Sequence, residues 1–219
     1  MKRVIKKVAA LMLAAIMIVG TSVSAFAAEP SIDKATATKM HSFSVDEVKA
    51  LEPFVSIREG QFVLDREKAL ACGIDADLID GQEVYFNYLN SQARNGKIII
   101  NKDLSITSAA ENVSPKASSG HWSSCGGGRN TSTTNYWWGY ARYACDCETR
   151  RMSSDFNSCA SVAAGIGVVG AYFGGIGAVP GGLSSAYFWL LASRLDANNH
   201  GRGVYIEMTW ALVFDITPQ

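Results

Sequence analysis

Residues 160–179 read ASVAAGIGVVGAYFGGIGAV, and they lie inside the stretch 159–193, which has no charged side chain. The stretch continues through Pro180 and two glycines into LSSAYFWLLAS. Twenty apolar residues in a helix would reach about 30 Å, the thickness of a bilayer's hydrocarbon core. Glycine is frequent here, and each glycine costs a water-exposed helix about 1 kcal/mol relative to alanine. We therefore expect a close-packed helical hairpin that is either buried in a core or directed at a membrane.

Small residues recur at intervals of four along this hairpin. Such spacing lets a neighbouring helix approach closely, both in membrane helix pairs and in soluble hairpins. The second half of the hairpin is too short to span a bilayer by itself. The pattern therefore predicts reversible insertion or a soluble hairpin, with a face for membrane contact or self-association. One row consists of Ala163, Gly167, Ala171 and Gly175, and a second of Gly170, Gly174 and Ala178.

Residues 1–28 have the layout of a secretory signal. Four Lys and Arg residues precede the apolar run 8–19, and Ala25 and Ala27 supply the small residues that signal peptidase reads. The alternative, an uncleaved membrane anchor, is disfavoured because the apolar run is short. We expect a secreted, extracellular protein without a covalent anchor, in association with a membrane or free of it.

Two modules are expected after the signal, and together they give an α+β protein. The first, residues 29–113, is an acidic module of short helices and strands, with a capping box formed by Ser44 and Glu47. The second, residues 121–219, is rich in Cys, Trp and Gly, and it combines the helical hairpin with an amphipathic β-strand. That strand is predicted over residues 204–217, where apolar and other residues alternate with period two. We expect it to pair with the segment 136–143 or with a partner molecule.

Between the modules, residues 114–120 (SPKASSG) have the composition of an exposed, protease-sensitive connection. Two interpretations stay open. The segment is an ordinary interdomain linker, or it is a processing site, with Lys116 as the candidate position, that separates a pro-region from an active C-terminal part.

Aromatic residues crowd into positions 136–143, among them Trp137, Trp138 and Tyr140. Tyr and Trp combine an apolar ring with a polar tip, which suits a membrane interface, a carbohydrate-stacking surface or the edge of a protein core. We expect these three residues either to cover the glycine-rich hairpin or to contact a membrane or partner.

Four of the five cysteines lie in the second module. In an exported protein an even local number favours disulfides, and we expect two of them. A bridge between Cys145 and Cys147 would be strained, which leaves two pairings open. A four-thiolate zinc site is the alternative, although the spacings fit no standard finger. Cys72 is the odd thiol of the first module. The disulfide candidates are Cys125, Cys145, Cys147 and Cys159.

Charge and motifs exclude several classes of function. Residues 29–119 hold ten Lys and Arg against fourteen Asp and Glu, a net charge of −4, and residues 120–219 hold six against six, with no lysine. Such a chain is a poor nucleic-acid binder. The three histidines, His41, His121 and His200, are scattered, and no nucleophile elbow, phosphate loop or zinc-protease motif is present. We expect no enzymatic activity, no cofactor and no metal.

The combination of NYWWGYARY, a Gly/Ala-rich apolar hairpin and HGRGVYIEMTW resembles uncharacterised small secreted proteins of Gram-positive bacteria, some of which look like bacteriocin precursors. The resemblance implies export and an antagonistic or envelope-directed role, and it assigns no functional residue. One expectation is therefore a bacteriocin-like protein whose C-terminal region acts on target-cell membranes after release from a pro-region. The other is a non-enzymatic protein that binds an envelope component or partner and has a disulfide-braced soluble core.

Overall fold

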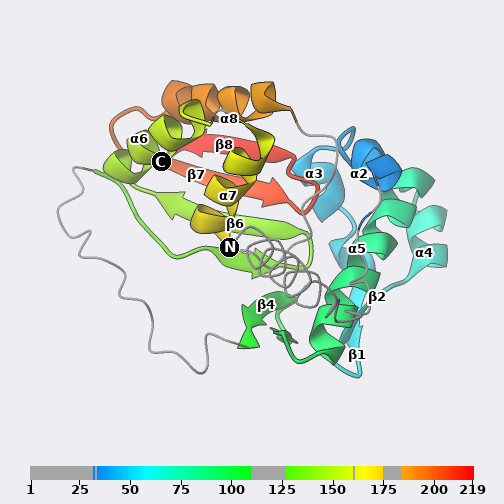
Figure 1. Ribbon diagram of the computed structural model, residues 1–219. Coiled ribbons are helices and arrows are strands. Elements are labelled where there is room, and N and C mark those ends of the chain that lie inside the picture. Colours follow the sequence, from blue (N-terminus) through cyan, green and yellow to red (C-terminus); the bar gives the residue numbers. More distant parts are fainter. Residues whose placement is uncertain (1–31, 33, 110–126, 160, 175–183) are drawn as a thin grey trace, which may run out of the picture. The chain divides into compact units, whose positions relative to one another are not determined.

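The computed structural model describes residues 32, 34–109, 127–159, 161–174 and 184–219, which belong to one compact unit (Figure 1). Helices and strands are mixed along this unit, so the expected α+β class is confirmed. The predicted signal at 1–28 and the predicted linker at 114–120 lie outside the described residues.

The first part of the chain folds into helices around a two-stranded hairpin. The predicted capping box is present, because Ser44 Oγ accepts a hydrogen bond from the Glu47 amide at 3.2 Å and the Glu47 carboxylate accepts one from the Ser44 amide at 2.7 Å. The Asn90 side chain bonds the amide and the carbonyl of Phe62 at 2.8 and 2.9 Å, which holds the hairpin against the longest of these helices. The elements are α2 (Lys34–Met40), α3 (Val45–Lys49), η1 (Glu52–Phe54), β1 (Val55–Arg58), β2 (Gln61–Leu64), α4 (Arg66–Ala71) and α5 (Ala76–Arg94).

A six-stranded antiparallel sheet follows, in which each strand pairs with the next strand along the chain. Tyr143 pairs with Tyr205, which confirms the expected pairing between the 136–143 segment and the alternating stretch. The single long strand expected over 204–217 is wrong, because the chain turns between its two halves and Leu212 takes a positive φ of 62°. The strands are β3 (Ile98–Ile100), β4 (Ser105–Ser108), β5 (Thr134–Tyr136), β6 (Gly139–Ala144), β7 (Val204–Thr209) and β8 (Phe214–Pro218).

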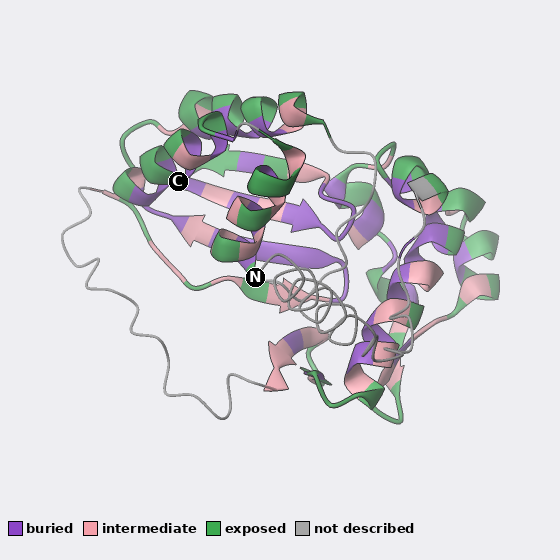
Figure 2. Ribbon diagram, in the orientation of Figure 1, coloured by how far each residue is buried: buried purple, intermediate pink, exposed green. Residues whose placement is uncertain are grey.

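Three helices, α6 (Asp146–Asn157), α7 (Val162–Phe173) and α8 (Ser185–Asn198), lie between β6 and β7 in the sequence. α6 and α8 pack along each other, with the rings of Phe156 and Phe188 stacked at a centroid distance of 6.3 Å. α7 contacts β6, since the ring of Phe173 lies 5.9 Å from that of Tyr140. Strands β6 and β7 are mostly buried, whereas the outer turns of these helices are exposed (Figure 2).

The sheet runs across the boundary that the sequence predicted between two modules. β4 belongs to the first predicted module and β5 to the second, yet Ser105 pairs with Tyr136 and Ile106 with Asn135. The described residues on either side of 114–120 therefore share one sheet.

Candidate functional site

Helix α7 lies within the described part of the Gly/Ala-rich stretch. It begins at Ser161, whose Oγ accepts a hydrogen bond from the Ala164 amide at 3.3 Å, and it ends before Gly174, which has a φ of 81°. Twelve residues of helix extend about 18 Å. Within the described part of the chain, no helix has both the length and the apolar character needed to cross a membrane.

One side of α7 packs inward against α8 and the sheet. Gly165 lies so close to the ring of Phe188 that a Cβ at this position would overlap the ring. Val169 and Phe173 follow on the same side and are buried. Because Gly165 has no side chain, the two helices can approach closely here.

The other side of α7 faces outward and carries no charge. Ala163, Gly167 and Ala171 are exposed, and a Cβ added at Gly167 would meet no atom within 4 Å among the residues that the structure describes. These positions form the predicted small-residue row, so its three described members are on the surface. Its fourth member, Gly175, lies outside the described residues.

Helix α8 adds two large apolar side chains to the surface. Trp189 is 55% exposed and Leu190 is 49% exposed, while the preceding Phe188 is fully buried. We call the exposed residues Ala163, Ala164, Gly167, Ala171, Trp189 and Leu190 the outer surface of α7 and α8.

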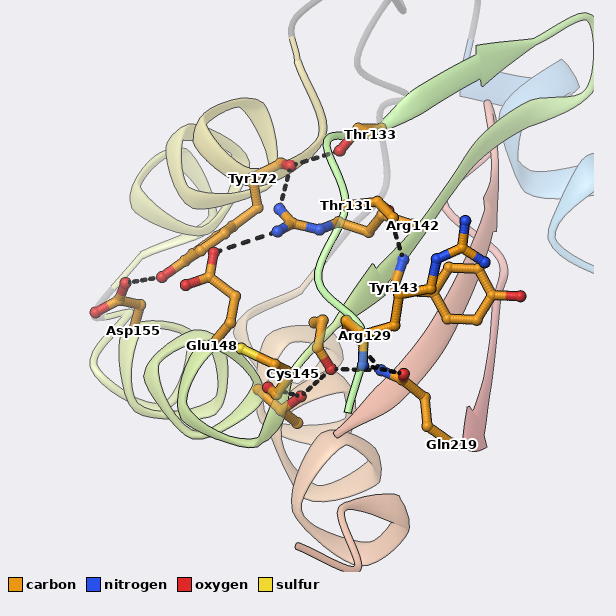
Figure 3. Close-up of polar contacts among 12 residues, drawn as sticks. Arg129, Thr131, Thr133, Arg142, Tyr143, Cys145, Glu148, Asp155, Tyr172 and Gln219 are labelled. Carbon is orange, nitrogen blue, oxygen red and sulfur yellow. Dashed lines mark hydrogen bonds and ion pairs between the residues drawn. The ribbon is translucent and has the colours of Figure 1, made fainter. Parts of the chain in front are cut away.

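A partly buried polar cluster, with Arg142 and Glu148 at its buried centre, fixes the C-terminal end of α7 (Figure 3). The Tyr172 carbonyl accepts hydrogen bonds from Arg142 Nη1 at 2.9 Å and from Thr133 Oγ1 at 2.8 Å. Arg142 also pairs with Glu148 of α6 at 3.3 Å, and the Tyr172 hydroxyl donates to Asp155 at 2.5 Å. The cluster thus ties α7 to β6, to α6 and to the segment before β5. A cation beside the last carbonyls of a helix is also favoured by the helix dipole.

The cluster is not fully satisfied. Arg142 Nε and Glu148 Oε2 make no hydrogen bond with any described residue, and both side chains are more than nine-tenths buried. Burial lowers the pKa of Arg142, and the charge of Glu148 opposes this. Burial, and then the hydrogen bond to Asp155, raise the pKa of Tyr172. Both pKa shifts arise because these side chains are partly removed from water. Hydrogen bonds and ion pairs are stronger in such surroundings, so they can hold α7 in place.

The aromatic residues proposed for membrane or partner contact are inside the fold. Trp137 is 1% exposed, and Trp138 and Tyr140 are each 4% exposed. The Trp138 ring stacks on Tyr136, and the Tyr140 ring packs edge-on against Trp210. The expectation that these three residues meet a membrane is therefore corrected, because the core covers them.

The cysteine prediction also needs correction. Cys147 lies in the first turn of α6, and Cys159 follows its end, so the helix holds their backbones about 18 Å apart. A disulfide needs Cα atoms within about 7 Å of each other. Cys159 is instead a buried thiol that donates to the Asp155 carbonyl at 3.3 Å, and burial raises its pKa.

Both two-disulfide pairings require Cys159 to bond with Cys145 or Cys147, and α6 prevents this. Cys145 is disulfide-bonded, whereas Cys147 and Cys159 are thiols. Cys125 lies outside the described residues, so its pairing stays a prediction. Among the residues that the structure describes, no group of three or more His, Cys, Asp or Glu side chains could hold a metal ion.

Sequence reasoning did not single out Trp189, Leu190 or the Arg142 cluster. Trp189 and Leu190 follow Phe188 in an unbroken apolar run, and periodicity does not tell which side of such a run faces outward. Arg142 could have been noticed as the one charged residue within the aromatic segment 136–144. No protein-family model matches the sequence, and neither a curated protein nor a solved structure shows significant similarity to the chain.

Proposed function

We propose that this is an exported, non-enzymatic, bacteriocin-like protein that binds a membrane surface through the outer surface of α7 and α8. The observation that carries the proposal is the half-exposed pair Trp189 and Leu190 beside a helix whose exposed side is uncharged. Trp favours the interface between water and lipid, and Leu gains free energy by entering the acyl region.

The proposed mode of binding is interfacial. α7 extends about 18 Å, which is well short of the hydrocarbon thickness of about 30 Å. Residues 120–219 contain no lysine and have balanced charge, so attraction to anionic lipid contributes little. Binding is therefore expected to be similar on zwitterionic vesicles and on vesicles with a third of anionic lipid.

Vesicle co-sedimentation of the chain without residues 1–28 tests the proposal. Trp189→Ser and Leu190→Ser should each weaken binding about tenfold. About half of each side chain is exposed, so only that half can transfer from water into the membrane, and the substitution removes its contribution. Leu70→Ser is the matched control, since Leu70 is a 41% exposed leucine on α4, outside the outer surface of α7 and α8. The proposal fails if the unmodified chain does not bind vesicles, or if Leu70→Ser weakens binding as much as Leu190→Ser.

Dye release from the same vesicles separates binding from killing. A membrane-damaging protein releases the dye and inhibits Gram-positive cells, and Trp189→Ser reduces both effects. If the protein bound vesicles without releasing the dye, its proposed function would be attachment to the cell envelope and not membrane damage.

A second candidate is a protein that binds an envelope partner or its own copy through the small-residue face of α7. Its support is the space over Gly167 and Gly170, where a Cβ would meet no atom of the described residues within 4 Å, so that another helix could approach. Gly167→Leu would block that approach. Light scattering of the chain without detergent tests self-association, and Gly167→Leu should abolish it. If the unmodified chain is a monomer at all concentrations, self-association is contradicted.

A further inference from the structure

We infer that residues 32–109 are a permanent structural part of the C-terminal half, so that cleavage near Lys116 gives a two-chain complex and releases no free fragment. The inference concerns processing and does not depend on membrane binding. It is carried by three independent groups of contacts between the two halves, all made by described residues.

The first group is the sheet. β4 supplies the strand next to β5, with Ser105 opposite Tyr136 and Ile106 opposite Asn135. The Trp137 amide extends the connection by donating to the Leu104 carbonyl at 3.1 Å. If β4 were removed, the edge of β5 would carry unpaired backbone groups, a well-known cause of aggregation.

The second group surrounds Trp137. Its ring meets that of Phe86 from α5 at a centroid distance of 6.0 Å. Its carbonyl accepts one hydrogen bond from Gln82 of α5 at 3.2 Å and another from Trp210 at 2.9 Å. Gln82 and Trp137 are each 1% exposed. Separation of the halves would expose a tryptophan at the centre of the core and would break a buried hydrogen bond.

The third group is ionic. Lys49 of α3 pairs with Glu207 of β7 at 2.8 Å and lies 5.3 Å from the centre of the Trp138 ring. The Glu207 side chain is only 13% exposed, and the Tyr205 hydroxyl also donates to it at 3.1 Å, so these two partners replace most of its contact with water. A poorly solvated carboxylate that loses its cation is strongly disfavoured.

These contacts imply that the N-terminal half completes the fold of the C-terminal half. The composition of 114–120 still makes it a reasonable place for a protease to cut. After such a cut the covalent link is lost, but strand pairing, the Trp137 contacts and the Lys49–Glu207 pair all persist.

The test places a specific protease site between Lys116 and Ala117 of the exported chain. After complete cleavage, gel filtration in native buffer should give one peak that contains both pieces, at the elution volume of the uncut protein. In 6 M guanidinium chloride the pieces should separate. Separate elution of the two pieces in native buffer, or precipitation of the C-terminal piece after cleavage, would overturn the inference.

A matched pair of substitutions tests whether the named interface holds the pieces together. Lys49→Met in the cut protein should raise the dissociation constant of the two pieces about tenfold, measured by exchange with a labelled N-terminal piece. Lys39→Met is the control, because Lys39 forms its 2.7 Å ion pair with Asp77 inside the N-terminal half. Equal effects of the two substitutions would contradict the assigned interface.

Discussion

Two tyrosines of this fold differ in whether their hydroxyl groups have a partner. The Tyr187 hydroxyl donates to the Leu212 carbonyl at 2.6 Å. The Tyr85 hydroxyl is buried and makes no hydrogen bond with the described residues. A buried hydroxyl without a partner carries a desolvation penalty of about 1–3 kcal/mol, whereas a made hydrogen bond contributes a net of about 1 kcal/mol. The same chemical change should therefore have opposite effects at the two positions.

Tyr85→Phe is expected to leave the free energy of unfolding unchanged or to raise it by up to about 1 kcal/mol, because it removes an unsatisfied polar group. Tyr187→Phe should lower it by about 1–2 kcal/mol, because it leaves the Leu212 carbonyl without this donor. Urea unfolding followed by tryptophan fluorescence measures both. Equal destabilisation by the two substitutions would show that Tyr85 has a polar partner after all.

At the scale of one helix, the glycines of α7 divide into those that packing requires and those that it does not. Gly165 lies against Phe188 with no room for a methyl group, whereas Gly167 and Gly170 face open space. Gly165→Ala should lower the free energy of unfolding by about 1–3 kcal/mol, the usual effect of overpacking. Gly167→Ala should raise it by up to about 1 kcal/mol, because alanine is the better helix former.

Thermal unfolding of these two variants is the measurement, and each controls for the other because they lie two residues apart in the same helix. If Gly165→Ala proved as stable as Gly167→Ala, the close approach of α7 to Phe188 would not exist in solution.

The same helix shows how far the sequence could predict the candidate site. The lack of charge and the helical hairpin were visible in the sequence, and α7 and α8 are indeed helices. The sequence does not predict which residue of α7 packs against α8. The four-residue rows point to Gly167 and Gly170, but the contact with α8 is made by Gly165, which belongs to neither row. Spacing identifies a face, whereas only the tertiary structure decides whether that face turns inward.

The strands give a similar lesson. Alternation over residues 204–217 predicts one strand, because period two continues across the turn between β7 and β8. Trp210, Ala211 and Leu212 are buried although they lie in that turn, so the hydropathy pattern carries no break there. The strand ends because the backbone of Leu212 takes a positive φ. Leucine seldom adopts this conformation, so the sequence does not predict it.

At the scale of the whole molecule, the change in composition at 114–120 suggested two modules, yet the described residues form one unit from 32 to 219. Composition reports how a chain segment interacts with solvent, and it does not report which strands will pair. The pairing of β4 with β5 joins residues about thirty positions apart, across the segment that looks like a linker. Long-range strand pairing of this kind is not encoded in a local pattern.

Burial of tyrosines in both halves gives the whole molecule a predictable response to alkali. Burial raises the pKa of four tyrosines, with an added contribution from Asp155 at Tyr172 and from Glu207 at Tyr205. The four are Tyr85, Tyr172, Tyr187 and Tyr205. In the unfolded chain each would ionise near pH 10. Above that pH the unfolded state therefore binds fewer protons than the native state, so the stability is complete below about pH 10 and is lost as the pH rises further.

Absorbance at 295 nm, which reports tyrosinate, measures this directly. At pH 11 the native protein should show at most half of the change that its eight tyrosines give in guanidinium chloride, because four of them stay protonated while the fold persists. The remaining change should appear in a single step, at the pH where circular dichroism reports unfolding. Tyr85 comes from α5, and the other three come from the C-terminal half. A two-step transition would mean that the two halves unfold separately, and full ionisation at pH 11 in the folded protein would mean that these rings are not buried as described.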